Sequence, residues 1–259
     1  MSDSKSIFAE IPDFHYQSGF MRPVSREAFD NIVHNRRSVR VYSDEKVPAE
    51  VVEQVLEWGL LAPNSSNLQA WEFYWVKDPI KKEKLVEALF SQPAARTAAE
   101  LIVAVARTNT WKRTRKQMLG YLQEDAEFPK RGIDYYKTLV PLVYTQGPLG
   151  IIGLIKKIVF AVVGIFRVTP REPSSMADMR VWAVKSTALA CENIMLGFSA
   201  FGFYSCPMEG HDSRRVKKIL SLGRGSEIVM VISAGKRNPE RGVYGPRIRM
   251  KKENFIKII

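Results

Sequence analysis

The sequence predicts an α/β or α+β sandwich, in which helices cover a sheet, because strand-like and helix-like segments alternate along it. The clearest strand-like runs lie at 101–106 and 227–235, where β-branched and other apolar residues dominate. The segment that ends near Gly202 is apolar on all sides, which is typical of a buried helix. A chain of 259 residues with 46% hydrophobic residues can bury a core of this kind.

Caps and turn residues divide the first part of the chain into successive elements. Residues 1–25 are expected to form an irregular N-terminal arm, since Pro12 and Gly19 interrupt it. Ser25 is placed to cap a first helix, and Pro48 to begin a second. The expected elements are a helix at 26–35, a helix at 48–61, a polar loop at 62–71, a strand at 72–79, a helix at 80–90 and a buried strand at 101–106.

The stretch at about 107–180 is the least regular part of the chain, and we expect it to leave the core fold as an excursion. Its basic residues cluster most densely at 111–116. The core resumes with the long apolar helix at about 180–202. A strand at 203–208, a helix at 212–222 and a strand at 227–235 complete it. No GxGxxG motif follows any of these strands, so the usual dinucleotide-binding fold is disfavoured.

The net charge of +12 and the pI near 9.7 predict an anionic partner: a phosphorylated cofactor, a nucleic acid or an acidic membrane surface. Cys191 and Cys206 have no CxxC partner and no histidine at metal-ligand spacing, so a metal site is not expected. The N-terminal residues contain no apolar core of signal-peptide length. We therefore expect a cytoplasmic protein with reduced thiols.

Three arginines crowd the sequence RRSVR, which begins at Arg36. In an extended segment, Arg36, Ser38 and Arg40 project to one side. Arg37 and Val39 then project to the other. Two guanidinium groups with a hydroxyl between them suit a phosphate group, because each guanidinium can donate paired hydrogen bonds to its oxygens. The alternative is a solvated basic surface.

Three later segments carry groups that can donate hydrogen bonds to a ligand. In APNSSNLQAW, Ser65, Asn67 and Gln69 stand at alternate positions and can bond a polar heterocycle or a sugar-like chain. In CPMEGHD, a proline near a strand end is followed by successive backbone N–H groups. In YGPRIRMKKE, Arg247 and Arg249 form a second pair of arginines at alternate positions. Taken alone, each segment is also compatible with an ordinary loop or surface.

In this order, the segments RRSVR, APNSSNLQAW, CPMEG and PRIR resemble the nitroreductase family of flavoproteins. The resemblance runs from about Arg36 to the end of the chain, apart from the excursion. It implies an α+β fold with a central, mostly antiparallel sheet flanked by helices, formed by residues 26–259 and completed by dimerisation. It also implies non-covalent FMN and an NAD(P)H-driven, ping-pong reduction of a small electrophile, such as a nitroaromatic or a quinone.

The resemblance assigns one set of residues to the cofactor phosphate. Arg36, Ser38 and Arg40 would hold the phosphate and the ribityl chain. Arg247 and Arg249 would reach the same phosphate from the C-terminal segment. The neighbouring Arg37 is a further candidate for this group.

A second set would meet the rest of the cofactor, and some of it would come from the partner subunit of the homodimer. The partner-side candidates are Asn64, Ser65 and Asn67, with Pro63 and Gln69 beside them. The candidates along the flavin ring are Pro207, Met208, Glu209 and Gly210, with backbone N–H groups aimed at its N5 and O4 edge, where negative charge develops on reduction. No side chain is assigned as an acid or base. Ala70 stands where the family loop usually has proline, which removes a rigid turn residue but no donor.

Other functions remain open on the sequence alone. A basic protein that binds nucleic acid or an acidic surface would fit the charge, but the chain has no zinc-finger, RNP or helix-turn-helix signature. A flavin-binding protein without turnover is a further alternative. The sequence does not choose between NADH and NADPH, or among nitro reduction, dehalogenation and dehydrogenation.

The apolar segment Gly147 to Phe166 resembles a membrane span at first, but Lys156 and Lys157 interrupt it. Three interpretations are open: a lid over the flavin, an arm packed on the partner subunit, or a helix lying in a membrane surface. The position within the excursion favours the lid or the dimer arm.

Overall fold

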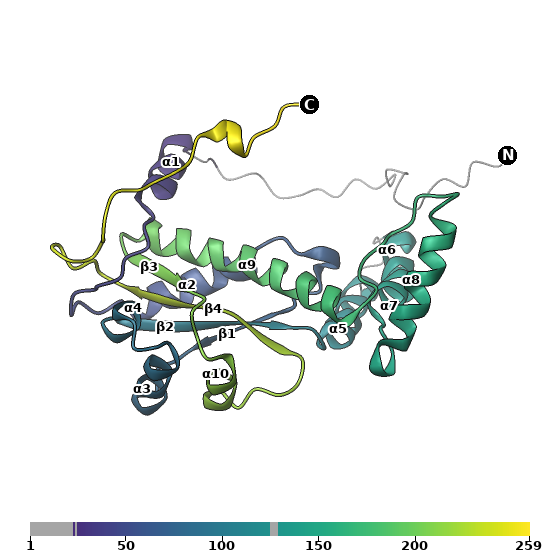
Figure 1. Cartoon of the computed structure of the whole chain (residues 1–259), viewed down its shortest axis with the longest axis horizontal. Coiled ribbons are helices and arrows are strands. Elements are labelled where there is room, and N and C mark those ends of the chain that lie inside the picture. Colours follow the sequence, from purple (N-terminus) through teal and green to yellow (C-terminus); the bar gives the residue numbers. More distant parts are fainter. Residues whose placement is uncertain (1–22, 24, 125–128) are drawn as a thin grey trace.

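The structure, a computed structural model, describes residues 23, 25–124 and 129–259, so most of the expected N-terminal arm lies outside the described residues. Within those residues, a four-stranded sheet in the order β1-β2-β4-β3 forms the core (Figure 1). All of its strand pairs are antiparallel, as the family resemblance implied. The strands are β1 Trp71–Trp75, β2 Glu100–Arg107, β3 Tyr204–Met208 and β4 Ser226–Gly235.

The central strand β2 is apolar along its length because both of its faces are covered. Leu101, Val103 and Val105 belong to the hydrophobic cluster on one face of the sheet. Ile102 and Ala104 belong to the cluster on the other face. A β-bulge between Ala104 and Val105 shifts the register against β4. The buried strand expected here is therefore confirmed.

Helices cover both faces of the sheet and produce a three-layer α+β sandwich, which confirms the predicted fold class (Figure 1). One face is covered by α2, Ala49–Leu60, and α9, Met176–Ala200. The other face is covered by α3, Pro79–Ala88, α4, Pro93–Arg96, and α10, Ser213–Ile219. A further helix, α1, Arg26–Asn35, contacts α9.

Side-chain caps set the ends of these helices. Ser25 accepts a hydrogen bond from the backbone N–H of Ala28 at 3.1 Å, as expected for the cap of α1. Helix α9 begins at Met176, earlier than the expected start near residue 180, because Ser175 caps it by accepting from the N–H of Asp178. It ends before Gly202, whose φ of +72° favours glycine at this position.

Helix α9 is not buried on all sides, contrary to the expectation from its composition. Val181 and Leu189 are exposed in the chain and lie beside a cavity described below. The apolar pattern predicted burial correctly for the side that faces the sheet, where Ile194 and Phe198 are fully buried.

The excursion is helical rather than irregular, and it extends from one end of the sandwich (Figure 1). Its helices are α5 Trp111–Glu124, α6 Lys130–Asp134, a π-helical turn Tyr135–Leu139, α7 Val140–Tyr144 and α8 Ile151–Val163. Trp111 and Tyr144 pack with Trp182 of α9 in a hydrophobic cluster of their own. This cluster attaches the excursion to the core fold.

Candidate functional site

The two arginine-rich segments meet in a small cleft, which we call the arginine cleft, although most of the chain separates them in sequence. The cleft has a volume of about 220 Å³. It is lined by Arg36, Arg37, Ser38, Arg40, Pro246, Arg247, Ile248 and Arg249.

The first segment is placed by the end of α1 and by the edge of the sheet. Arg36 is the C-cap of α1, and its backbone N–H donates to the carbonyl of Ile32 at 3.1 Å. Ser38 forms an isolated parallel bridge with Ser205 of β3. Val39 then buries its side chain in the core and fixes the segment against the sheet. The arginines therefore lie on a rigid part of the fold.

The structure corrects one part of the expected alternation. Arg37 lines the same cleft as Arg36, Ser38 and Arg40, although a fully extended segment would direct it to the opposite side. The segment departs from ideal extension because Arg36 still belongs to the helix cap. Only Val39 turns away from the cleft into the core.

Hydrogen bonds hold the C-terminal segment against the first one. The guanidinium of Arg37 donates to the carbonyl of Gly245 at 2.6 Å. The guanidinium of Arg247 donates to the carbonyl of His34 at 2.8 Å and also to the carbonyl of Arg36. These contacts bring Arg249 to the cleft as well.

The cleft carries an excess of positive charge. Partial desolvation lowers the pKa of Arg247, and the neighbouring guanidinium groups of Arg249, Arg37 and Arg36 lower it further. Among the described residues, Glu192 of α9 is the one carboxylate within ion-pair distance of these arginines, with its Oε1 3.7 Å from the Nε of Arg36. An anion with several oxygen acceptors fits this donor set, and a phosphate group is such an anion.

The segment Pro207 to Gly210 lies along the same edge of the sheet. Pro207 and Met208 belong to β3 and pair with β4, so the strand continues through the proline rather than ending there. β3 is an edge strand, and an edge position tolerates proline because its missing N–H faces away from the ladder. Glu209 and Gly210 follow the strand and are exposed, and the carbonyl of Gly210 accepts a hydrogen bond from Gln92 at 3.0 Å.

His211 was not singled out by its sequence pattern, but it directly follows this segment. Burial lowers the pKa of His211, although the backbone of Met208 and the carboxylates of Glu209 and Asp212 act in the opposite direction. The imidazole is therefore expected to be neutral near pH 7. No periodicity or motif marks an isolated histidine of this kind in a sequence.

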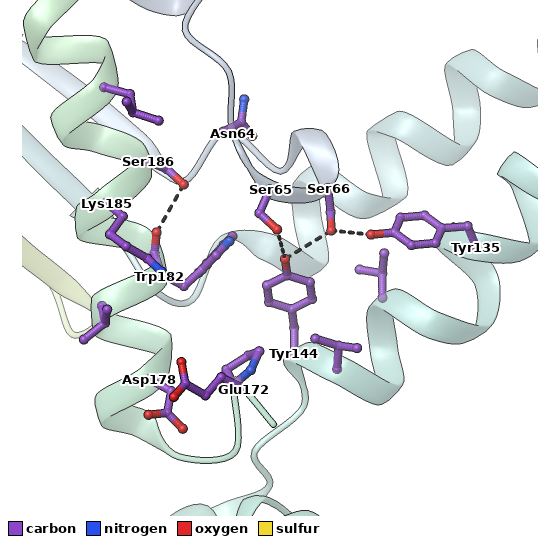
Figure 2. A pocket seen from close by; sticks show the side chains of 15 residues that line it. Asn64, Ser65, Ser66, Tyr135, Tyr144, Glu172, Asp178, Trp182, Lys185 and Ser186 are labelled. Atoms are coloured by element: carbon purple, nitrogen blue, oxygen red, sulfur yellow. Dashed lines mark hydrogen bonds between the residues drawn. The ribbon is translucent and has the colours of Figure 1, made fainter. Parts of the chain in front are cut away.

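A second cavity of about 500 Å³ lies between the polar loop, the excursion and α9 (Figure 2). We call it the hydroxyl cavity, because Ser65, Ser66, Tyr135 and Tyr144 direct their hydroxyl groups toward one another at its wall. The Ser65–Tyr144 distance is 3.0 Å and the Ser66–Tyr135 distance is 2.6 Å. Its remaining lining residues are Asn64, Val140, Val143, Glu172, Pro173, Asp178, Val181, Trp182, Lys185, Ser186 and Leu189.

Of the polar loop residues predicted as cofactor ligands, Asn64 and Ser65 line the hydroxyl cavity, and Pro63, Asn67 and Gln69 do not. The loop is not extended, because Ser65–Asn67 forms a 3-10 turn. Asn64 closes this turn by accepting the backbone N–H of Gln69 at 2.8 Å. Ser65, Asn67 and Gln69 nevertheless remain exposed, and the side-chain amide of Gln69 donates to Oδ1 of Asn67 at 3.4 Å, so their role as cofactor ligands stays a prediction.

No sequence pattern predicts the two tyrosines of the cavity. Tyr135 and Tyr144 come from the excursion, for which no motif was available. The sequence offers one weak signal, because Tyr144 is a polar aromatic residue in an otherwise apolar run. In the structure, burial raises the pKa of Tyr144, and Ser65 and Ser66 form hydrogen bonds with its hydroxyl group.

The arginine cleft and the hydroxyl cavity have no lining residue in common. They lie beside different parts of α9, since Glu192 pairs with Arg36 while Trp182 and Lys185 line the hydroxyl cavity. The described chain therefore does not join all the predicted cofactor ligands in one pocket.

Comparison with known proteins supports the family resemblance. A model of the nitroreductase family matches residues 33–236, which include RRSVR, APNSSNLQAW and CPMEG. The chain belongs to the nitroreductase family. This membership confirms the enzyme class expected from the sequence, an FMN-dependent oxidoreductase. The roles of the individual residues stay predictions.

Individual relatives are similar in sequence or fold to this nitroreductase-family protein over most of its length. It is 26% identical to an NADH dehydrogenase of Thermus thermophilus over 77% of this chain and 82% of the relative. Its fold is similar to that of ydfN from Bacillus subtilis, with a TM-score of 0.71, 22% identity and coverage of 91% and 100% of the two chains. A protein of Exiguobacterium sibiricum in complex with FMN gives a TM-score of 0.66 at 21% identity, over 89% and 97% of the chains.

Proposed function

We propose that this protein binds FMN through the arginine cleft and uses it to reduce small electrophiles with electrons from NAD(P)H, in alternating half-reactions. The cleft carries the proposal, because it joins two arginine-rich segments from opposite ends of the chain around a space suited to a phosphate group. The relative named NADH dehydrogenase and the similar structure in complex with FMN support the donor and the cofactor.

The residues of the cleft would act by binding and orienting the cofactor. Arg36, Arg40 and Arg249 would donate charge-assisted hydrogen bonds to the phosphate, and Ser38 would add a neutral donor. A cleft of about 220 Å³ accommodates the phosphate but not the whole of FMN. The ring would therefore lie outside it, along the edge of β3.

The exposed backbone after β3 would serve the ring. The N–H groups of Glu209 and Gly210 would stabilise negative charge on the ring edge, since backbone donors aimed at a developing charge lower its energy. FMN would supply the redox chemistry by accepting a hydride from the nicotinamide and passing the electrons to the acceptor. No side chain of the chain needs to act as an acid or base in this proposal.

We propose a homodimer in which the hydroxyl cavity of one subunit completes the site of the other. Asn64 and Ser65 lie in a cavity separate from the arginine cleft, which supports their contribution to a partner's site. Val181 and Leu189 are exposed apolar residues beside that cavity, and a partner subunit would cover them. The apolar walls and hydroxyl groups suit a small, partly polar acceptor such as a quinone or a nitroaromatic compound.

The absorption spectrum of the purified protein tests this function directly. We expect flavin bands, bleaching of those bands under anaerobic conditions when NADH or NADPH is added, and recovery when a quinone or a nitroaromatic compound follows. Protein that retains no flavin after reconstitution with excess FMN would contradict the proposal. Retained flavin that neither nicotinamide reduces would instead support a flavin-binding protein without turnover.

A further inference from the structure

Helix α8 presents its polar side to the protein and its apolar side to the surroundings. The buried positions of α8 are Gly153 and Lys156. The ammonium group of Lys156 donates to the carbonyls of Val143 at 2.7 Å and Pro173 at 3.3 Å. These bonds tie the helix to the backbone on either side of it rather than to an apolar core.

Gly153 makes this attachment possible by its small size. A Cβ atom at this position would lie 2.3 Å from Oε1 of Gln146 and 2.5 Å from the carbonyl oxygen of Ser174. The backbone of α8 therefore lies directly against two polar segments. Gly153 and Lys156 are on the same side of the helix, because they are three positions apart.

The opposite side of α8 is a broad apolar surface at the periphery of the molecule (Figure 1). Leu154, Ile155 and Ile158 are exposed to 60%, 55% and 59% of their surface. The exposed apolar residues of α8 and its flanks are Leu149, Ile151, Ile152, Leu154, Ile155, Ile158, Val159, Val162, Val163, Ile165, Phe166 and Val168. We call this set the α8 apolar face. Surfaces of this kind indicate contact with another apolar phase or partner.

All the charged residues of the segment that forms this face are positive. The segment from Gly147 to Arg171 contains four basic residues and no acidic residue. Lys157, Arg167 and Arg171 are exposed, whereas Lys156 is turned inward. Basic residues beside an apolar surface are complementary to anionic lipid headgroups above a hydrocarbon layer.

The size of α8 indicates a position in the membrane surface rather than across it. A helix of 13 residues is about 20 Å long at about 1.5 Å per residue, which is shorter than a hydrocarbon core of about 30 Å. Within the described ranges, no single helix is long and apolar enough to cross a membrane. The helices Lys130–Tyr144 and Pro148–Val163 satisfy length and composition together, but they are bent by 73°.

We propose that the α8 apolar face docks into the interfacial region of an anionic phospholipid bilayer. The sequence favoured a lid or a dimer arm for this segment, but no α8 residue lines the hydroxyl cavity or the arginine cleft. A second copy of the chain is less suitable as the occupant, because two copies packed through this face would offer no acidic residue of the segment to pair with Lys157, Arg167 and Arg171. The proposal does not depend on flavin binding.

Sedimentation of the full-length protein with lipid vesicles tests this docking. We expect binding to vesicles of phosphatidylcholine and phosphatidylglycerol, weaker binding to phosphatidylcholine alone, and weakening by salt. The double variant Ile155→Glu/Ile158→Glu should bind at least about tenfold more weakly, since two apolar side chains lose their burial. Ile80→Glu is the matched control, because Ile80 is 63% exposed on α3, and it should bind like the wild type.

The measurement also separates docking from other effects. Lys157→Gln/Arg167→Gln should reduce the preference for phosphatidylglycerol while keeping binding driven by the apolar face. Unchanged sedimentation of Ile155→Glu/Ile158→Glu, with circular dichroism like that of the wild type, would overturn the proposal. Absence of vesicle binding by the wild type would also overturn the proposal. In that case, a mass of Ile155→Glu/Ile158→Glu in light scattering that is lower than that of the wild type would assign the α8 apolar face to a contact with a second copy.

Discussion

Arg37 and Gly245 are 208 positions apart in the sequence, yet the guanidinium of Arg37 donates a hydrogen bond of 2.6 Å to the Gly245 carbonyl. This bond fixes the C-terminal segment just before it enters the arginine cleft. Arg247 strengthens the same attachment through the carbonyls of His34 and Arg36. The cleft therefore depends on a long-range contact that neither arginine-rich motif reveals by itself.

Loss of this contact should loosen the C-terminal segment. We expect Arg37→Ala to accelerate tryptic cleavage after Arg247 and Arg249 severalfold in the flavin-free protein, because local opening releases the backbone of this segment and lets it enter the protease. Peptide mass spectrometry over a time course measures the rates. Arg214→Ala removes an exposed arginine of α10 and serves as the control. Equal cleavage rates in the wild type and Arg37→Ala would show that the bond does not hold the segment.

Both cysteines should be unreactive in the folded protein. Burial raises the pKa of Cys191 to about 12, and the neighbouring carboxylate of Glu192 adds to this effect. Burial also raises the pKa of Cys206. We expect iodoacetamide to label neither thiol at a useful rate near neutral pH, and to label both rapidly in denaturant. Rapid labelling of Cys206 in the native protein would place it in a more open environment than the structure gives.

Two glycines of the excursion should respond oppositely to the same substitution. Gly153→Ala brings a Cβ into contact with Gln146 and Ser174, so it should lower the free energy of unfolding by about 1–3 kcal/mol. Gly120→Ala in α5 meets no heavy atom within 4 Å and should raise it by about 0.5–1 kcal/mol. Denaturant titration measures both. Equal effects of the two substitutions would contradict the close packing of α8.

His211 should make stability depend on pH in a defined direction. Its pKa lies below the ordinary value of 6.5 because burial disfavours the charged imidazole. Well above pH 6.5 the imidazole is neutral in both the folded and the unfolded states. As the pH falls below 6.5, the unfolded chain takes up a proton first, so the free energy of unfolding decreases down to the folded pKa.

The test compares the wild type with His211→Asn by denaturant titration at several pH values. The variant should lose less stability on acidification, because one group that favours the unfolded state at low pH has been removed. Identical slopes in the two proteins would indicate that His211 is accessible to protons in the folded state.

Local signals in the sequence predicted the framework well. Ser25 marks the start of α1 by capping it, and Gly202 marks the end of α9 by adopting a left-handed conformation. Both features depend on residues only a few positions apart. The start of α9 lies earlier than the apolar pattern predicts, because Ser175 accepts from the N–H of Asp178 while the Asp178 carboxylate accepts from the N–H of Ser174, and neither of these polar caps contributes to an apolar pattern. The framework could be predicted because caps and periodicity are local properties.

The site was predictable only where a motif existed. The arginine cleft was expected from two motifs, and the structure brings their side chains together. Asn67 and Gln69 follow or belong to a 3-10 turn and do not line the hydroxyl cavity, so their predicted role is not decided by the described chain. Tyr135 and Tyr144 reach Ser65 and Ser66 by packing of the excursion, and such long-range packing leaves no local pattern.

FMN carries the phosphate that the arginine cleft is proposed to hold, and riboflavin lacks it. The difference between their affinities therefore measures the contribution of the phosphate. Arg249→Ala is the informative variant, because the Arg249 guanidinium contacts the carbonyl of its neighbour Ile248 rather than the other segment. A lost charge-assisted hydrogen bond costs about 1.5–3 kcal/mol, which corresponds to a loss of affinity of about tenfold or more.

Fluorescence titration of the flavin-free wild type, Arg249→Ala and the control Arg214→Ala with both ligands is therefore the most direct test of phosphate binding by the arginine cleft. We predict that the wild type and Arg214→Ala bind FMN far more tightly than riboflavin, and that Arg249→Ala weakens FMN by about tenfold or more while leaving riboflavin unchanged. Equal affinities of the wild type for FMN and riboflavin would contradict the assignment of the arginine cleft to the phosphate.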